Sequence, residues 1–337
     1  MEKINKLKKI FKQQQINGYI IPKNDEFFGE YISENKDRLK YISGFSGSYG
    51  FSLILENINY LFVDGRYTLQ ANKQSGKFFK IKTIPNFLPR DLLKKKRLKI
   101  GFDPKLFTKK SLDFFFGKTN CKYISLKENL IDKIWVRKKS KEKNKFYILP
   151  TNSIGKNYKL KVDKIVSELI RKKADYQFIT ASENNAWLLN IRGNDSKYTP
   201  IPHCYILIDR KKNITFFCDL RNISKSFKKK FENIKFTNIN LADKTLSKII
   251  KKRFIIDKNT CSIYFQNIIL KNNILLSQDD YIYNLKAIKT KKEIQNIKEA
   301  HIVDGVALTK FLFWLKKNLN EKKITEISSA QKLLSLR

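Results

Sequence analysis

The sequence has 337 residues, which is too long for one ordinary domain, and its 42% hydrophobic and 13% aromatic residues exclude intrinsic disorder for most of the chain. No run approaches 18 uninterrupted apolar residues, so the sequence predicts no membrane-spanning helix. The net charge of +39 argues only weakly for a nucleic-acid partner, because just 11 of the 70 basic residues are arginine, which phosphate clamps favour, and lysine is spread along the whole chain.

The first third of the chain predicts a helix followed by strands. Apolar residues at helical spacing predict a helix over residues 3–15, which we expect Gly18 to end. Three strands are expected after it, over residues 19–22, 51–55 and 60–63. The last of these strands is closed by Asp64-Gly65-Arg66.

The second third repeats this order after a boundary. Residues 137–157 are rich in lysine and turn-forming residues and lose the apolar period, which predicts a boundary there. A helix is expected over residues 162–170. Strands are expected over residues 177–180, 204–208 and 214–218. Asp219-Leu220-Arg221 closes the last strand, as Asp64-Gly65-Arg66 does in the first third.

This repetition predicts a duplicated α/β domain with a mixed sheet, since hairpins alternate with helices. We therefore expect a first domain over residues 1–150 and a second over 158–285. Residues 286–337 contain a long amphipathic helix and the start of another, which still continues at Arg337. We interpret them as the first helices of an incomplete third domain.

Motifs in a fixed order along the chain resemble those of a known family. In the first domain they are Ile21-Pro22, Gly29-Glu30-Tyr31, Ser43-Gly44-Phe45-Ser46-Gly47-Ser48 and Val63-Asp64-Gly65-Arg66-Tyr67. In the second they are Ala186-Trp187-Leu188-Leu189-Asn190-Ile191-Arg192-Gly193-Asn194-Asp195 and Tyr198-Thr199-Pro200, and in the third Ala300-His301 with Asp304-Gly305. The chain resembles the three-domain Xaa-Pro aminopeptidases, the aminopeptidase P branch of the creatinase superfamily. Where the family usually has a histidine between its first Asp and Glu, this chain has Glu26-Phe27-Phe28-Gly29.

The resemblance implies two creatinase-like domains followed by a "pita-bread" metallopeptidase domain. In that family two Mn²⁺ ions, held by two Asp, one His and two Glu, activate a bridging hydroxide that attacks the peptide bond before proline. The resemblance places all of these ligands beyond Arg337, so we expect no catalytic residue and no metal ligand in this chain. The expected partners are short peptides with proline second, and a second copy of the complete protein in a homodimer.

The residues themselves point to a reducing cytoplasm. The N-terminal residues lack the apolar segment of a signal peptide, and the four cysteines contain no C-x-x-C pair. Only two histidines are present, His203 and His301. His301 and Asp304 share a helical face, but a metal site needs at least three converging ligands, so a surface polar pair is the favoured interpretation.

Four residues are candidates for contacting substrate, namely Glu30, Arg66, Arg192 and Asp195, and the resemblance implies that the first two lie near the substrate end of the active site. Glu30 and Arg66 are the strongest candidates for recognising a peptide amine, although Asp64 could fix a turn and Arg66 could bridge to Glu30 as scaffold. Arg192 and Asp195 could contact substrate or cap the next turn. Trp187 is expected in the core.

The resulting functional hypothesis is the N-terminal part of a metal-dependent Xaa-Pro aminopeptidase, inactive by itself. Two alternatives remain at this point. The chain could be a non-enzymatic subunit that binds peptides or regulates a partner, or a basic protein that binds nucleic acid, for which the charge of +39 is the supporting feature.

Overall fold

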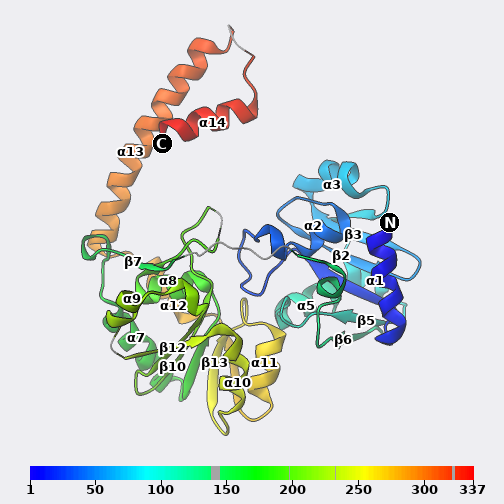
Figure 1. Cartoon of the computed structure of the whole chain (residues 1–337), viewed down its shortest axis with the longest axis horizontal. Helices are drawn as coiled ribbons and strands as arrows, with labels where there is room; N and C mark the ends of the chain where they lie inside the picture. The colour runs from blue at the N-terminus through cyan, green and yellow to red at the C-terminus, as the bar shows by residue number, and fades with distance from the viewer. Residues whose placement is uncertain (138–144, 197, 232, 321–322) are drawn as a thin grey trace.

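The computed structural model describes residues 1–137, 145–196, 198–231, 233–320 and 323–337. It contains two α/β bodies, each built on a six-stranded sheet, and a long helix that extends away from the second body (Figure 1). We call the first body, from α1 to α6, module I, and the second, from β7 to α12, module II. The lysine-rich part of the predicted boundary, residues 138–144, lies outside the described residues.

Module I contains six strands in the spatial order β4-β3-β2-β1-β5-β6. The strands are β1 (Gly18–Pro22), β2 (Gly50–Leu55), β3 (Asn59–Asp64), β4 (Lys80–Ile84), β5 (Lys99–Phe102) and β6 (Lys122–Ser125). The helices are α1 (Glu2–Gln13), α2 (Arg38–Ser43), α3 (Thr68–Ser75), α4 (Pro89–Leu93), α5 (Lys109–Phe116) and α6 (Leu130–Ile134).

Module II has the same sheet, in the order β12-β11-β10-β8-β13-β14. Its strands are β8 (Tyr176–Ile179), β10 (Cys204–Asp209), β11 (Ile214–Cys218), β12 (Ile234–Asn238), β13 (Arg253–Asp257) and β14 (Ile274–Gln278), with β7 (Tyr147–Ile148) and β9 (Ile191–Arg192) as a separate pair. Its helices are α7 (Tyr158–Arg171), α8 (Ser182–Leu189), α9 (Lys225–Lys229), α10 (Ala242–Ser247), α11 (Ile263–Leu270) and α12 (Tyr281–Ala287).

The two sheets pair their strands identically. In each, the first strand lies antiparallel to the hairpin and parallel to the fifth strand, and both edges are parallel pairs. The predicted duplication and the mixed α/β class are therefore confirmed. The hairpin β2–β3 and its counterpart β10–β11 are the antiparallel pairs that the alternating strands and short turns predicted.

Each sheet is covered on both faces because its central strands are apolar on both sides. Along β1, Tyr19 and Ile21 face the core formed with α1, α2 and α6, whereas Ile20 faces the core formed with α4 and α5. In module II, Ile206 faces α7 and α8, and Leu207 faces α10 and α11. This layering places loops at the ends of the strands, where the modules meet.

The expectation that Gly18 ends the first helix was wrong. Helix α1 ends at Gln13, and Gln15 takes the left-handed conformation that reverses the chain. Gly18 instead begins β1, where a Cβ atom would lie 2.8 Å from the Ile54 carbonyl oxygen and closer still to Leu55. Glycine is therefore required here for close strand pairing rather than for a helix cap.

Helix α13 (Lys291–Asn318) and helix α14 (Glu326–Leu336) follow module II and pack on one another (Figure 1). A capping box between Thr290 and Glu293 starts α13, with the Glu293 carboxylate 2.7 Å from the Thr290 backbone nitrogen. Although α13 carries many apolar residues, only Ala307 and Asn318 are buried in it. None of the helices in the described ranges is long and apolar enough to cross a membrane.

Candidate functional site

The two modules are joined by reciprocal aromatic and backbone contacts. Phe27 of module I packs into the module II core, stacked on His203 with ring centroids 4.2 Å apart and on Tyr205 at 5.3 Å. In the opposite direction, Ile263 of α11 packs into the module I core, and its backbone N–H donates to the Phe107 carbonyl at 2.8 Å. Because each module inserts a side chain into the other, the loops at this junction are held in a defined geometry.

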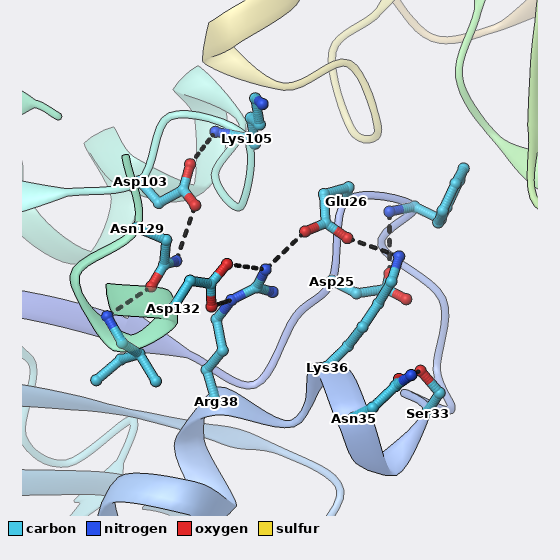
Figure 2. A network of polar contacts seen from close by, with 12 residues as sticks. Asp25, Glu26, Ser33, Asn35, Lys36, Arg38, Asp103, Lys105, Asn129 and Asp132 are labelled. Carbon is cyan, nitrogen blue, oxygen red and sulfur yellow. Dashed lines mark hydrogen bonds and ion pairs between the residues drawn. The ribbon is translucent and has the colours of Figure 1, made fainter. Parts of the chain in front are cut away.

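A partly buried network of ion pairs, centred on the buried Arg38, lies beside this junction (Figure 2). The Arg38 guanidinium, 5% exposed, donates through Nε and Nη2 to both oxygens of Asp132 at 2.8 and 2.9 Å. Its Nη2 also donates to Glu26 Oε1 at 2.8 Å, and Lys36 binds the other Glu26 oxygen at 2.8 Å. Arg137 binds Asp132 as well. The network thus ties the loop that follows β1 to helices α2 and α6.

The electrostatics of the network favour its charged form. Burial opposes the ionisation of Glu26, but Lys36 and Arg38 outweigh this and hold the pKa of its carboxyl well below the usual range. Burial acts in the same way on Asp132, whose pKa is nevertheless lowered by hydrogen bonds from Arg38 and Arg137. Both carboxylates are therefore ionised at neutral pH, which lets them stay paired with the cations around them.

Asp25 shapes the turn that presents Phe27. Its side chain is 1% exposed, and Oδ1 accepts the Phe27 backbone N–H at 2.9 Å. Burial raises the pKa of this carboxyl, and Lys36 lowers it in part. Phe28 follows in the left-handed conformation, with φ of 56°. Residues 25–28 therefore form one compact turn. This turn carries the Glu26 carboxylate of the network and the Phe27 ring that packs into module II.

Among the residues predicted to contact substrate, Glu30 and Arg66 are both exposed on module I. Arg66 binds Asp64 with both Nε and Nη2, at 3.2 and 2.6 Å, and its side chain is 73% exposed. The hydrogen bond and charge of Asp64 raise the pKa of Arg66, with a smaller contribution from Glu30. Glu30 makes no hydrogen bond or ion pair with any described residue. Arg66 is therefore paired to Asp64 rather than to Glu30, which leaves the Glu30 carboxylate available.

The Asp64–Arg66 pair has a duplicate in module II. Arg221 binds Asp219 through Nε and Nη2 at 3.0 and 2.6 Å, again on a short 3₁₀ helix directly after a hairpin strand. In both copies the Asp side chain also accepts the Arg backbone N–H. Because the same Asp–Arg ion pair occurs in both modules, the pair stabilises the end of the hairpin strand. A role in binding would therefore involve the side of the Arg66 guanidinium that faces solvent.

Arg192 and Asp195 make internal contacts in module II. The Arg192 Nη1 donates to the carbonyls of Ala186 and Ile191, at 3.3 and 2.9 Å, beside the C-terminus of α8. Asp195 Oδ2 accepts the His203 backbone N–H at 2.8 Å, which connects its loop to the start of β10. Both residues therefore stabilise the loop between β9 and β10 through hydrogen bonds.

The loops that carry Glu30 and Asp195 meet across the junction. Tyr31, the neighbour of Glu30, contacts Tyr198 edge to face with ring centroids 5.0 Å apart. Tyr198 belongs to the second-module motif Tyr198-Thr199-Pro200, so motifs about 170 residues apart in sequence form one surface. The geometry thus brings the Glu30 segment together with the Asp195 loop, whereas Arg66 lies on the module I side alone.

Trp187 is only partly buried and caps a buried lysine. Lys161 is 4% exposed, lies 4.1 Å from the Trp187 ring centroid, and donates to the Trp187 carbonyl at 2.7 Å and to Asn190 Oδ1 at 2.5 Å. Burial opposes the ionisation of Glu293 at the start of α13, but its hydrogen bonds with Thr290 lower its pKa, and the Trp187 indole adds to this lowering. Trp187 therefore links module II to α13 besides packing on the core.

Burial lowers the pKa of Lys161 to about 8, an effect that Arg192 and Lys156 increase and Glu293 opposes. Because the unfolded chain binds this proton up to a higher pH, the lysine makes the folded state more stable as pH rises from 8 to 10, by about 1.4 kcal/mol per pH unit at most. We expect the loss of stability caused by Lys161→Met to be larger at pH 10 than at pH 7 in urea unfolding. Lys164→Met, on the exposed face of α7, is the control and should cost the same at both pH values. A pH-independent loss for Lys161→Met would contradict the shifted pKa.

The described residues do not fit a metal. No group of three or more His, Cys, Asp or Glu side chains converges within the described ranges. His301 is exposed, and Asp304 is bound by Arg337 at 2.7 Å. His203 is packed against Phe27, and burial lowers its pKa to about 4, so it is neutral at physiological pH and serves as a stacking partner.

Sequence reasoning missed the residues that organise the junction, above all Arg38, Asp132 and Phe27. Arg38 lies 94 residues from Asp132, and neither residue belongs to a motif that indicates pairing. The available signal was the unusual run Glu26-Phe27-Phe28, where an acid and two aromatic residues stand in a loop.

Known proteins match this architecture along the whole chain. The Creatinase/Prolidase N-terminal domain family matches residues 3–133, and a second model of the same description matches residues 137–293. The chain is 32% identical to Xaa-Pro aminopeptidase 1 of Dictyostelium discoideum and 31% identical to a probable Xaa-Pro aminopeptidase P of Laccaria bicolor, in each case over all of this chain and 57% and 55% of the relative.

A crystal structure of X-prolyl aminopeptidase from Caenorhabditis elegans, described as a cytosolic enzyme with a di-nuclear active site, matches all of this chain and 59% of that one with a TM-score of 0.91 and 26% identity. The chain thus spans a little over half the length of the relatives that it matches. Two tandem copies of the Creatinase/Prolidase N-terminal domain show that the chain belongs to that family, and the chain is similar along its whole length to Xaa-Pro aminopeptidases.

Proposed function

We propose that this chain is the substrate-restricting, N-terminal part of a metal-dependent Xaa-Pro aminopeptidase, which removes the residue before proline from the N-terminus of short peptides. The observation that supports this most directly is the match of the whole chain to the C. elegans X-prolyl aminopeptidase structure. The di-nuclear site named for that enzyme is consistent with two metal ions, which we propose to be Mn²⁺. We further propose that the complete protein is a cytoplasmic homodimer.

The part proposed for this chain is binding rather than chemistry. Because no metal-binding cluster exists among the described residues, we derive no catalytic step in this chain. Glu30 is the residue best suited to recognise a peptide N-terminus, since a carboxylate without a protein partner attracts an ammonium group. The pKa of Arg66 is raised mainly by Asp64 and in smaller part by the charge of Glu30, so Arg66 lies close enough to orient the Glu30 carboxylate. Arg192 and Asp195 would act indirectly, by holding the loop that Tyr198 joins to Tyr31.

Hydrolysis by the chain itself provides the first test. We expect residues 1–337, supplied with Mn²⁺ and an Xaa-Pro peptide, to release no free N-terminal amino acid above a protein-free control. Hydrolysis that depends on the protein would contradict the assignment of the metal ligands to another segment.

The coding DNA beyond codon 337 provides the second test. We expect a reading frame there that encodes the two Asp, one His and two Glu that the family uses to hold its metals. A frame without these residues would favour the non-enzymatic subunit instead.

A further inference from the structure

A cavity of about 570 Å³ lies between the modules, beside the network of Figure 2. From module I it is lined by Glu26, Phe27, Lys36, Arg38, Lys105 and Arg137. From module II it is lined chiefly by α10 and α11, with Asp243, Tyr264 and Phe265. Its volume lies within the range of about 300–1,000 Å³ that is typical of small-molecule sites. A cavity of this size at a junction of two domains is a plausible ligand site on geometry alone, and its charges indicate which ligand.

The two carboxylates that line the cavity, Glu26 and Asp243, are already satisfied. Both oxygens of Glu26 are bound, Oε1 by Arg38 and Oε2 by Lys36. Asp132 does not line the cavity, and both Arg38 and Arg137 bind it. Asp243 accepts the Tyr264 hydroxyl at 2.8 Å. A ligand cation would therefore compete with several bound protein cations, and the cavity is poorly suited to one.

Hydrogen-bond donors on the cationic side chains, in contrast, remain available. The Nη1 of Arg38 and the Nε of Arg137 are buried without a hydrogen-bond partner among the described residues. A buried guanidinium N–H without an acceptor is costly, and such a group indicates a missing acceptor. The ammonium of exposed Lys105 lies 4.7 Å from the Tyr264 ring centroid and forms no ion pair with a described carboxylate. The lining residues include four cations, Lys36, Arg38, Lys105 and Arg137, but only two carboxylates, Glu26 and Asp243, so the lining carries a surplus of positive charge.

The other wall is aromatic and rigid. Phe27, Tyr205, Phe265 and Tyr264 form a continuous series with successive ring centroids 5.2–5.3 Å apart. Its position is set by backbone and hydroxyl hydrogen bonds across the junction, from the Tyr264 N–H to the Pro104 carbonyl at 3.0 Å and from the Tyr205 hydroxyl to the Glu26 carbonyl at 2.9 Å. The cavity is therefore formed before any ligand arrives, with an aromatic, apolar side and a cationic side.

We propose that this cavity binds a small organic anion, in which a planar ring carries one phosphate or carboxylate group. The ring lies against the aromatic wall, and the anionic group faces Lys105 at the rim and the guanidinium groups of Arg38 and Arg137. Bound there, the anion contacts both modules and stabilises their junction. This site is separate from Glu30 and Arg66, which do not line the cavity, and it is independent of the proposed peptidase function.

Isothermal titration calorimetry of the 337-residue chain tests this proposal with four probes in 150 mM KCl. AMP supplies ring and phosphate, phenylacetate supplies ring and carboxylate, adenosine lacks the anion, and inorganic phosphate lacks the ring. We expect AMP, phenylacetate or both to bind at least about tenfold more tightly than adenosine and phosphate. The tighter of the two distinguishes a phosphate ligand from a carboxylate ligand. Equal affinity for all four probes, or binding by none at millimolar concentration, would overturn the proposal.

A pair of charge reversals distinguishes the cavity from general attraction to a basic protein. Lys105→Glu places a carboxylate at the rim, whereas Lys109→Glu makes the same change on α5, outside the lining residues. Both positions are exposed, so both variants should fold. We expect Lys105→Glu to weaken binding of the preferred probe about tenfold and Lys109→Glu to leave it within twofold. Equal weakening by the two variants, or none by Lys105→Glu, would overturn the assignment of the site.

Discussion

Replacement of Arg38 by methionine is expected to lower the free energy of unfolding by about 3 kcal/mol, the lower end of the range for breaking a buried ion pair, because it removes the buried residue that binds both carboxylates of a partly buried network. Asp132 would lose two hydrogen bonds from Arg38, and Glu26 would lose one. Methionine nearly preserves the volume of the side chain, so most of the effect comes from partly buried carboxylates that are left with fewer partners. The loss would appear in urea unfolding at pH 7.

Arg66→Met is the matched control for this experiment. Arg66 also binds one aspartate with two nitrogens, but its side chain is 73% exposed, against 5% for Arg38. An exposed pair of this kind contributes between about 0 and 1 kcal/mol, so Arg66→Met should have little effect on stability. Similar losses for the two variants would contradict the view that burial makes the Arg38 network important.

Acid provides a second readout of the same network. The pKa of Glu26 in the folded protein is held well below its ordinary value of 4.5 by Lys36 and Arg38 against the effect of burial. Its contribution to stability is therefore fully present above about pH 4.5 and is lost as pH falls further towards the folded pKa. Arg38→Met removes part of that contribution, so the difference in stability between the two proteins should shrink between pH 5 and pH 3.

Local features of the fold were predictable because they depend on neighbours in sequence. The β10–β11 hairpin follows from two apolar runs around the turn at Asp209, whose side chain accepts the backbone N–H groups of Lys211 and Asn213. The Asp-x-Arg ion pairs also join residues two positions apart. The repeated order of these local signals was sufficient to indicate duplication before any sheet was known.

The junction was not predictable in this way, because its energetics depend on contacts between distant segments. Tyr205 meets Glu26 across 179 residues, and no periodic pattern predicts which loop of one module docks on which strand of the other. For the same reason the sequence suggested Glu30 and Arg66 but could not tell that Arg66 would be bound by Asp64 and Glu30 left free. Motif resemblance locates a surface, whereas the partners of each side chain on it depend on the tertiary packing.

The C-terminal helices lead to the second large effect. In α13 the apolar residues lie on every side of the helix, and Ile302, Val303 and Phe313 are each 69% exposed. Each large apolar side chain that is left in water forgoes about 1.5–3 kcal/mol relative to burial. We therefore expect residues 1–337 to self-associate or aggregate through α13, as continuous apolar surfaces do.

Shortening the chain should reverse this association, provided that the cut spares module II. The sequence suggested an end near residue 285, but Leu285 packs against the module II core and the Lys286 ammonium donates to Asn184 at 2.6 Å. We propose an end after Lys289, which keeps α12 and removes α13 and α14. Static light scattering at matched concentration and salt should show a monomer for residues 1–289 and larger species for the full chain.

Two substitutions in the full chain separate the apolar surface from the mere loss of residues. Val303→Lys and Phe313→Lys together place charge at two of the most exposed apolar positions of α13 and leave its capping box intact. Because lysine is a good helix former, we expect the helix to remain and the larger species to decrease. If the unsubstituted full chain is instead monomeric and the shortened chain behaves no better, α13 is adequately covered by α14, and its apolar residues do not drive association.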